Sequence, residues 1–304
     1  MKIGFLVEKR YLGQAMPGPV IRTFRDRHVD SDVICPEGCQ FDPLTGVVRR
    51  DDGATFNLNL YDAIVSRNRN ALGLAMLSYA DAAGIPAINT HAATQRVRNK
   101  AKMAIALGRV GVPCAPTVLA DNIAALANLP SDWFPLILKA TYGDNSQGLR
   151  LIRRPEDLDD VRWRENLVLA QHYLANDGFD LKLYVCGRTV FAVRKPSPFN
   201  GDPTATPQPV RPDVRMMDIA LRCGDAFGLD IYGVDTVETA QGPAVIEVNE
   251  FPNFTGVPDA ATQIAEYILA QIGQRRDDTC ESHSLSNGRS NGRQRAAAQP
   301  VLAR

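Results

Sequence analysis

Short apolar runs and stretches of helical spacing alternate along the first third of the chain. Apolar residues recur at helical intervals over Val20 to Val29 and over Leu72 to Ala83, and Gly84 stops the second of these helices. Four apolar runs predict strands: Lys2 to Val7, Ser31 to Cys35, Leu60 to Arg67 and Ile85 to Asn89. Strands that alternate with helices indicate a small parallel α/β domain over residues 1–93.

The pattern changes after residue 93. A helix is predicted from about Thr94 to Gly108. The apolar run Leu136 to Lys139 is followed by a polar loop with glycines, Thr141 to Gly148, and then by the run Leu149 to Ile152, which predicts a hairpin. We therefore expect residues 94–170 to form a second, smaller lobe with antiparallel strands.

Residues 171–273 are expected to form a third segment of α+β type. Six prolines predict a loop from Pro196 to Pro212, and Gly228 ends a helix predicted over Val214 to Phe227. A closing helix is predicted over Ala260 to Ile272. The runs predicted as strands in this half of the chain are Leu167 to Ala170, Leu181 to Cys186, Thr189 to Val193, and a final antiparallel pair, Ile231 to Thr236 with Ala244 to Asn249.

The last segment, residues 274–304, has a different composition. It lacks aromatic residues, and it holds six arginines against three acids. Because it offers little apolar area to offset the entropy of ordering, we expect a disordered tail. Weak contact with a polyanion or a partner is the functional alternative.

The composition excludes several classes of protein. The chain has 304 residues, 34 basic and 34 acidic, which argues against a nucleic-acid-coating surface. No apolar stretch is long enough for a membrane span. The first apolar run is followed at once by the charged residues Glu8, Lys9 and Arg10, so it is too short for a signal peptide. The six cysteines are scattered, and Cys35 with Cys39 lacks the second pair that a zinc site needs. We expect a cytoplasmic protein with reduced thiols; its oligomeric state is open, a homo-oligomer included.

Common catalytic and nucleotide motifs are absent from the sequence. The motif GxGxxG does not occur. Gly143 and Gly148 have the spacing of GxxxxGK[ST], but Leu149 stands where that motif needs lysine. Asp144 replaces the first glycine of a GxSxG elbow around Ser146, and the four histidines form no HxxxH pair. These absences argue against dinucleotide-binding, P-loop, zinc-protease and α/β-hydrolase proteins.

Three oxygen-bearing side chains gather on the last predicted strand pair. Glu247 and Asn249 are two residues apart and therefore face the same way, and the partner strand can place Asp235 opposite them. Two carboxylates and an amide oxygen suit Mg²⁺ carrying phosphates. The alternative is a polar edge strand with solvated acids, but the apolar neighbours Val234 and Val248 favour a metal site.

Basic residues at the ends of predicted elements form a second group. Lys139 closes a buried run just before the glycine-containing loop, whose backbone amides can wrap phosphate oxygens around Gly143, Asn145 and Ser146. Lys100 lies near the start of a helix, where the helix dipole favours an anion. A solvated surface lysine is the usual alternative for either residue alone.

Together these segments resemble the ATP-grasp superfamily over about residues 1–272. The resemblance rests on Asn99-Lys100, Leu138-Lys139 with YGDNSQG, Leu169 to Leu174, Asp180-Leu181-Lys182, and GVD followed by VIEVNEFP. Within the superfamily the chain is similar to RimK-type amino-acid ligases and also to the inositol-phosphate kinases of that fold. The resemblance implies an α/β N-terminal domain followed by an α+β ATP-grasp fold, in which two lobes with antiparallel sheets clasp ATP.

The resemblance also implies roles for individual residues. Gln171, His172, Tyr173 and Leu174 would be the hinge beside adenine, although RimK-type hinges usually carry Glu where His172 stands. The phosphate-binding residues would be Lys100 and Lys139, with Asp180 on the ribose side and Lys182 at the phosphates or substrate. Asp235, Glu247 and Asn249 would hold one or two Mg²⁺ (or Mn²⁺) ions. Arg194 would face the transferred phosphoryl group.

Arg67 is a further candidate that follows from its position. It ends the third N-terminal strand, at the edge where open parallel sheets bind ligands. We expect it to bind a substrate carboxylate or phosphate, the alternative being a solvated arginine.

The favoured function is an ADP-forming ligase for a carboxylate and an amine. A small-molecule carboxylate would attack the γ-phosphoryl group of ATP, and an amine from an amino acid or peptide would displace phosphate from the acyl phosphate. Such an enzyme acts by positioning and charge neutralisation and needs no nucleophilic side chain. No nucleic acid or membrane partner is expected.

Two other functions stay open at this point. An ATP-grasp kinase would move the same phosphoryl group to a hydroxyl of an inositol-phosphate-like molecule. Against it, Gln147 stands where that family has histidine. A non-enzymatic ATP-binding protein is the third possibility, and the complete set of Asp235, Glu247 and Asn249 argues against it.

Overall fold

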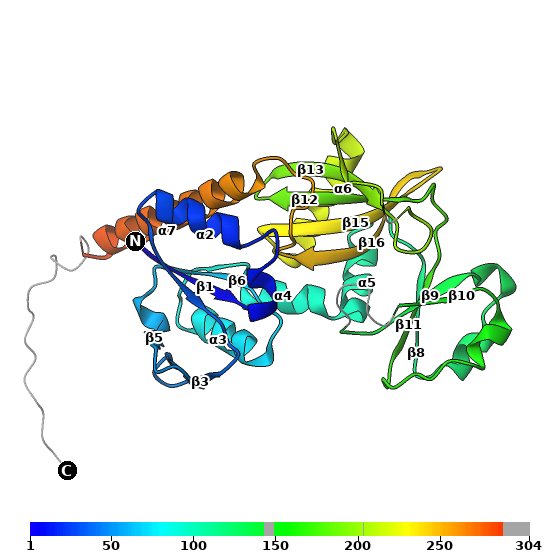
Figure 1. Cartoon of the computed structure of the whole chain (residues 1–304), viewed down its shortest axis with the longest axis horizontal. Helices are drawn as coiled ribbons and strands as arrows, with labels where there is room; N and C mark the ends of the chain where they lie inside the picture. The colour runs from blue at the N-terminus through cyan, green and yellow to red at the C-terminus, as the bar shows by residue number, and fades with distance from the viewer. Residues whose placement is uncertain (143–148, 203, 288–304) are drawn as a thin grey trace, which may run out of the picture.

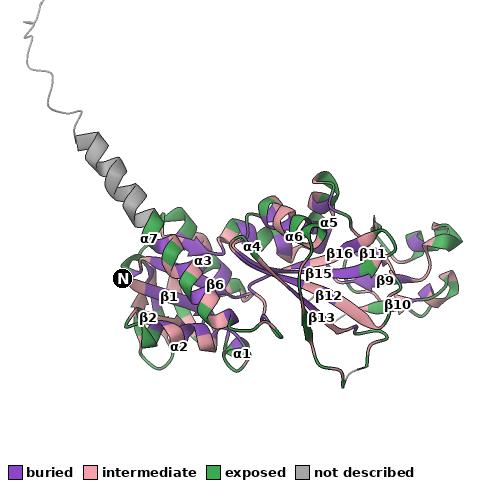
Figure 2. Cartoon of the chain, turned by 90° about the horizontal axis from the view of Figure 1, so that it is seen from above, coloured by how far each residue is buried: buried purple, intermediate pink, exposed green. Residues whose placement is uncertain are grey.

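The computed structural model describes residues 1–142, 149–202 and 204–287, with side chains up to residue 274. Figure 1 shows three of the sheets in a row, the N-terminal parallel one at the left, the largest in the centre and a four-stranded one at the right. Buried residues follow the strands of the sheets, and exposed residues lie on the outer faces of the helices (Figure 2). None of the helices in the described part of the chain combines the length and apolar composition that a bilayer crossing requires.

The N-terminal sheet is parallel, as the alternating pattern predicts. Its strand order is β2-β1-β6-β7. Alternate residues of β1 face opposite layers: Phe5 packs toward helix α2, whereas Leu6 packs toward helix α3. The elements of this part are β1 (Lys2–Val7), α1 (Lys9–Leu12), α2 (Gly18–Asp26), β2 (Asp30–Ile34), β6 (Ala63–Arg67), α3 (Ala71–Ala82) and β7 (Ala87–Ile88).

A three-stranded antiparallel sheet inserted between β2 and β6 has no counterpart in the sequence prediction. Its strands are β3 (Cys39–Asp42), β4 (Val47–Arg50) and β5 (Thr55–Asn57), and the short helix η1 (Leu58–Leu60) follows. The strands are short and largely polar, so they lack a clear apolar alternation. Gly46 and Gly53 make the tight turns, with φ of 74° and 88°.

The single helix predicted over Thr94 to Gly108 is wrong, because two helices occupy this region. They are α4 (His91–Arg98) and α5 (Lys100–Arg109). Asn99 separates them with extended backbone, and its side chain accepts a hydrogen bond from the Lys102 amide at 2.9 Å. The cap places Lys100 in the first turn of a new helix.

The sheet at the right of Figure 1, called here the small sheet, has the strand order β10-β9-β11-β8 and is antiparallel throughout. The predicted hairpin is confirmed as β9 (Leu136–Lys139) paired with β10 (Arg150–Ile152). The remaining elements of this sheet are β8 (Thr117–Ala120), β11 (Val168–His172) and the short helices η2 (Ala124–Asn128), η3 (Ser131–Trp133) and η4 (Pro155–Leu158).

The largest sheet has the strand order β14-β13-β12-β15-β16 and is antiparallel. Part of the predicted loop Pro196 to Pro212 is in fact strand β14, at the sheet edge, where a proline is tolerated. Helices α4, α5 and α6 cover the face that carries Leu183 and Val234. The elements are β12 (Phe179–Cys186), β13 (Thr189–Pro196), β14 (Gln208–Val210), α6 (Val214–Phe227), β15 (Ile231–Thr239) and β16 (Gly242–Glu250).

The closing helix is longer than predicted. Helix α7 spans Ala260–Asn287, so the segment expected to be a disordered tail is helical over residues 274–287. This stretch contains neither glycine nor proline, so no helix-breaking residue interrupts the helix that begins at Ala260. Residues 288–304 of the predicted tail lie outside the described residues.

Close packing of α6 on β15 gives a testable consequence for stability. A Cβ at Gly224 would lie 2.1 Å from the hydroxyl oxygen of Tyr232, which itself donates to the Ala220 carbonyl. We expect Gly224→Ala to lower the free energy of unfolding by about 1–3 kcal/mol. Gly108→Ala is the matched control: it lies in α5 with open space around the added methyl, so stability should stay equal or rise slightly. Urea unfolding of both variants measures these two changes in the free energy of unfolding.

Candidate functional site

A β-bulge lies where the predicted carboxylates come together. Asp235 on β15 pairs with Glu247 on β16, but the next residue, Thr236, pairs with Val245. Ile246 is therefore the extra residue of the bulge, and its carbonyl accepts a hydrogen bond from the Lys139 ammonium at 3.2 Å. The irregularity brings a lysine of the small sheet to the carboxylates of the large one.

The two carboxylates are paired with lysines. The Lys182 ammonium lies 2.8 Å from Asp235, and the Lys100 ammonium lies 2.9 Å from Glu247. The Asn249 amide donates to Asp235 at 2.8 Å. Cross-strand partners share a face, so this face of the sheet carries a compact group of both charges.

Burial and charge act in opposite directions on these groups. Burial alone would raise the pKa of Asp235, but the Lys182 ammonium outweighs it and holds the pKa below the ordinary value. Burial lowers the pKa of Lys139. Within the described residues, no carboxylate lies as close to its ammonium as Glu247 lies to Lys100 or Asp235 to Lys182. An anion bound beside Lys139 would offset this cost.

The donor set fits a hard divalent cation. Asp235, Glu247 and Asn249 offer two carboxylates and an amide oxygen, the ligand type that Mg²⁺ prefers. Within the described ranges, no three residues among His, Cys, Asp and Glu converge as a complete cage. A cation here would therefore take further oxygens from a bound substrate or from water.

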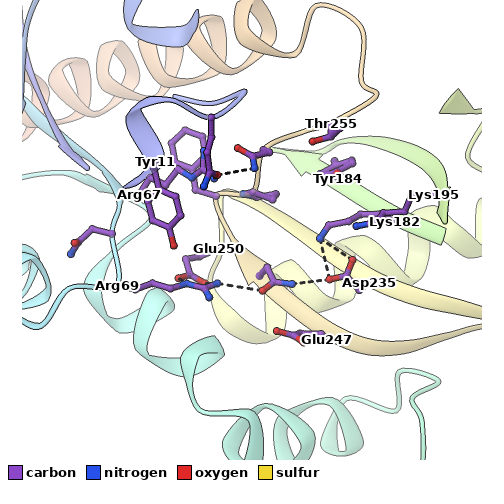
Figure 3. Close-up of a pocket in the computed structure, with 16 residues that line it drawn as sticks. Tyr11, Arg67, Arg69, Lys182, Tyr184, Lys195, Asp235, Glu247, Glu250 and Thr255 are labelled. Atoms are coloured by element: carbon purple, nitrogen blue, oxygen red, sulfur yellow. Dashed lines mark hydrogen bonds and ion pairs between the residues drawn. The ribbon is translucent and has the colours of Figure 1, made fainter. Parts of the chain in front are cut away.

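Two cavities meet at these carboxylates. The larger, of about 390 Å³, lies between the N-terminal sheet and the large sheet (Figure 3). The smaller, of about 180 Å³, lies between the small sheet and the large sheet and is called here the hinge cavity. Lys195, Asp235 and Glu247 line both. A molecule in one cavity can therefore approach a molecule in the other at this group of charges.

The hinge cavity collects most of the residues predicted to bind nucleotide. Its lining includes Lys139, Gln171, His172, Tyr173, Leu174 and Asp180. Burial raises the pKa of the Asp180 carboxyl. The predicted loop residues Gly143, Asn145 and Ser146 lie outside the described residues.

The His172 side chain contacts protein. Its ring nitrogen Nδ1 lies 3.0 Å from the Trp133 carbonyl oxygen, and the two rings pack edge to face. The rings of Tyr173 and Phe199, which also line the cavity, pack edge to face. The cavity therefore offers flat apolar walls together with the backbone at the end of β11.

The prediction that Arg194 faces the reacting groups needs correction. Arg194 pairs with Leu181, whereas Lys195 pairs with Asp180, so Arg194 lies on the opposite face of the sheet from Asp235. There its guanidinium lies 2.6 Å from Asp177 and stacks over Phe179. Lys195 lines both cavities instead. The alternation of β12 places Asp180 and Lys182 on one face, but which residue of β13 shares that face depends on the register between the two strands.

Arg67 is not a solvated arginine. Only 6% of it is exposed, and it lines the larger cavity. It donates to the Gln14 side chain at 2.8 Å and to the Met16 carbonyl, and it lies over the ring of Tyr11. These contacts hold the guanidinium in place, opposite Lys182 and Lys195 in Figure 3.

Arg69 was not among the predicted site residues. Its guanidinium donates to Glu250 at 2.8 Å and to the Asn249 oxygen at 3.3 Å, which ties the N-terminal sheet to β16. Its position two residues beyond Arg67, and that of Glu250 directly after Asn249, were the available signals.

Comparisons with known proteins agree on one family. The family model of the RimK-like ATP-grasp domain matches residues 97–272. A probable alpha-L-glutamate ligase of Mannheimia succiniciproducens is 30% identical over 73% of this chain and 81% of its own length. The ribosomal protein bS6--L-glutamate ligase of Salmonella schwarzengrund is 29% identical over 65% of this chain and 71% of its own.

Solved structures show the same fold. The RimK domain ATP-grasp protein of Sphaerobacter thermophilus superposes with a TM-score of 0.65, at 20% identity, over 88% of this chain and 100% of that one. This confirms the predicted fold class. The named relatives are ligases, and they give no support to the kinase interpretation.

Proposed function

The chain belongs to the RimK-like ATP-grasp family, and from this premise we propose that it uses ATP to join a carboxylate to an amine of an amino acid or peptide. The observation that carries the proposal is the meeting of two cavities at Asp235, Glu247 and Lys195. A ligase of this type must bring a nucleotide and an acid together at one group of charges. A single pocket with one entrance would not supply that arrangement.

In this proposal the hinge cavity holds the nucleotide. Adenine lies beside Gln171 to Leu174, and Asp180 faces the ribose side. Lys139 and Lys100 neutralise phosphate oxygens, and the ligand's charge offsets the burial of Lys139. Because the His172 ring contacts Trp133, the backbone rather than this side chain recognises the base.

Asp235, Glu247 and Asn249 would hold Mg²⁺ (or Mn²⁺), whose charge neutralises the phosphates and polarises the transferred group when it is bound. Without phosphate present, Lys182 and Lys100 balance the carboxylates. The same lysines can turn toward phosphate oxygens once a cation takes the carboxylates. The charges of these lysines and carboxylates would therefore be balanced both with and without bound phosphate and cation.

The larger cavity holds the acid and the amine. The acid's carboxylate oxygen attacks the γ-phosphorus, and the bond to the ADP oxygen breaks, which gives an acyl phosphate and ADP. The amine nitrogen then attacks the acyl carbon, and phosphate leaves as the amide forms and the amine loses a proton. Lys182 and Lys195 stabilise the charge that develops on the transferred group. Arg67, fixed by Gln14 and Tyr11, binds a carboxylate of the substrate.

We retain residues 1–93, 94–170 and 171–273 as the proposed domains. We also propose that the enzyme acts in the cytoplasm, where ATP is available.

The test of this function is a product assay with Mg-ATP and pools of amino acids, peptides and inositol phosphates. We expect ADP release to require an acid and an amine together, and mass spectrometry to detect their condensation product, one water lighter than the sum. Release of ADP with a single hydroxyl compound, and a phosphorylated product, would instead establish a kinase.

A further inference from the structure

The side-chain amide of Asn249 is held in one orientation by two neighbours. Its nitrogen donates to Asp235 at 2.8 Å, and its oxygen accepts from the Arg69 guanidinium at 3.3 Å. In Figure 3 the dashed lines run from Arg69 through this amide to Asp235. The amide therefore presents a donor, rather than its oxygen, to the carboxylate with which it would share a cation.

Arg69 is itself fixed on both sides. Its backbone amide donates to Glu8, and its guanidinium donates twice to Glu250, at 2.8 Å from Nε and at 3.2 Å from Nη2. The Glu250 side chain is only 5% exposed. The Nη2 group that donates to Glu250 is also the one that donates to Asn249. Because a two-point contact between guanidinium and carboxylate fixes direction as well as distance, Arg69 stays in place when the amide turns.

Arg69 and a cation therefore compete for one oxygen. A cation shared by Asp235 and Asn249 needs the amide oxygen on the Asp235 side, where the amide nitrogen now lies. Turning the amide would bring its N–H groups against the Arg69 guanidinium, which carries donors only. Cation binding through Asn249 thus exchanges a hydrogen bond for a contact between two donors.

We infer that Arg69 is a positioning residue that keeps the Asn249 oxygen away from the metal site and so weakens cation binding there. This inference rests on the proposed function, which requires the cation. Arg69 belongs to the segment after β6 and lines the larger cavity. A residue of the N-terminal part of the chain therefore controls a metal ligand that β16 supplies.

Arg69→Lys tests the inference, with Mn²⁺ as the probe and a non-hydrolysable ATP analogue at saturating concentration. Lysine keeps a positive charge for Glu250, but it lacks the fork that reaches Asn249 at the same time. We expect this variant to bind Mn²⁺ at least about threefold more tightly, measured from the electron paramagnetic resonance signal of free Mn²⁺. Arg69→Met should tighten binding at least as much, and Arg69→Lys keeps the test valid if the methionine variant does not fold.

Two comparisons separate the amide from other causes. In an Asn249→Ala background, Arg69→Lys should change the affinity for Mn²⁺ by less than about 1.5-fold, because the amide through which Arg69 acts is gone. Arg98→Lys is the matched control. Arg98 lines a cavity together with Arg69 and Asn249, but within the described part of the chain no hydrogen bond joins it to Asn249, so the affinity should stay unchanged.

The inference is overturned if Arg69→Lys binds Mn²⁺ as the unmodified protein does, or more weakly. It is also overturned if the gain persists without the Asn249 amide, or if neither the unmodified protein nor the variant binds Mn²⁺. Because none of these measurements requires turnover, they do not depend on whether the product is an amide or a phosphate ester. The product assay can therefore contradict the proposed function while the Mn²⁺ result stands.

Discussion

Replacement of Glu247 with glutamine is expected to lower kcat/KM about a thousandfold or more while the fold stays intact. Glutamine has the same shape, and the Glu247 side chain is partly exposed, so the packing of β16 is preserved. The change removes one of two carboxylates at the point where the cavities meet. Asp235→Asn should have the same effect on turnover, since its side chain lies directly opposite on β15.

The matched control for this experiment is Glu238→Gln. Glu238 is an exposed carboxylate on β15, three residues beyond Asp235, and it approaches Arg194 rather than the cavities. Its replacement should leave kcat/KM within about twofold, because an exposed ion pair contributes little. The measurement is ADP release at varied Mg²⁺, with circular dichroism to check the fold. Full activity in Glu247→Gln would disprove the metal assignment.

Replacement of Lys195 with methionine is expected to lower kcat/KM about a hundredfold or more. Lys195 lines both cavities on the face that carries Asp235, and its ammonium can reach a group transferred between them. Methionine keeps the length and apolar stem of lysine and removes the charge. Stability should change little, because the side chain is only partly buried.

The neighbouring residue provides the control for Lys195. Arg194→Met removes a positive charge one position away, but from the opposite face of β13, where Arg194 pairs with the exposed Asp177. We expect kcat/KM to stay within about threefold and the free energy of unfolding within about 1 kcal/mol. Parallel kinetics of the two variants decide between the faces. If Arg194→Met is the inactive one, the assignment of Lys195 is wrong.

Elements with a strong local sequence signal were the most predictable part of the fold. Strand β1 (Lys2–Val7) and helix α6 (Val214–Phe227) have the bounds that the sequence predicts, because a continuous apolar run marks the strand and a terminal glycine marks the end of the helix. The break at Asn99 was not predicted, since the helical spacing continues across it and the cap depends on one side-chain hydrogen bond. Strand β14 was missed because prolines at a sheet edge resemble those of a loop.

The candidate site was predictable where its residues are close in sequence. Glu247 and Asn249 share a strand, and a single strand pairing places Asp235 beside them. Arg194 and Lys195 could not be told apart without the register between β12 and β13. The position of Arg69 beside Arg67 was a signal, but its ion pair with Glu250 could not be predicted, because no local pattern links the two residues.

The bulge at Ile246 divides β16 into two halves whose alternation is out of phase. Val245 and Val248 both face the helices although they lie three positions apart, which an uninterrupted strand would not allow. Loss of Ile246 would leave each half in its own phase and restore a regular ladder. Deletion of Val248, which lies between the bulge and Asn249, would instead place Glu247 and Asn249 on opposite faces of the strand. Strand β16 is therefore expected to tolerate the deletion of one residue at Ile246, where the bulge lies.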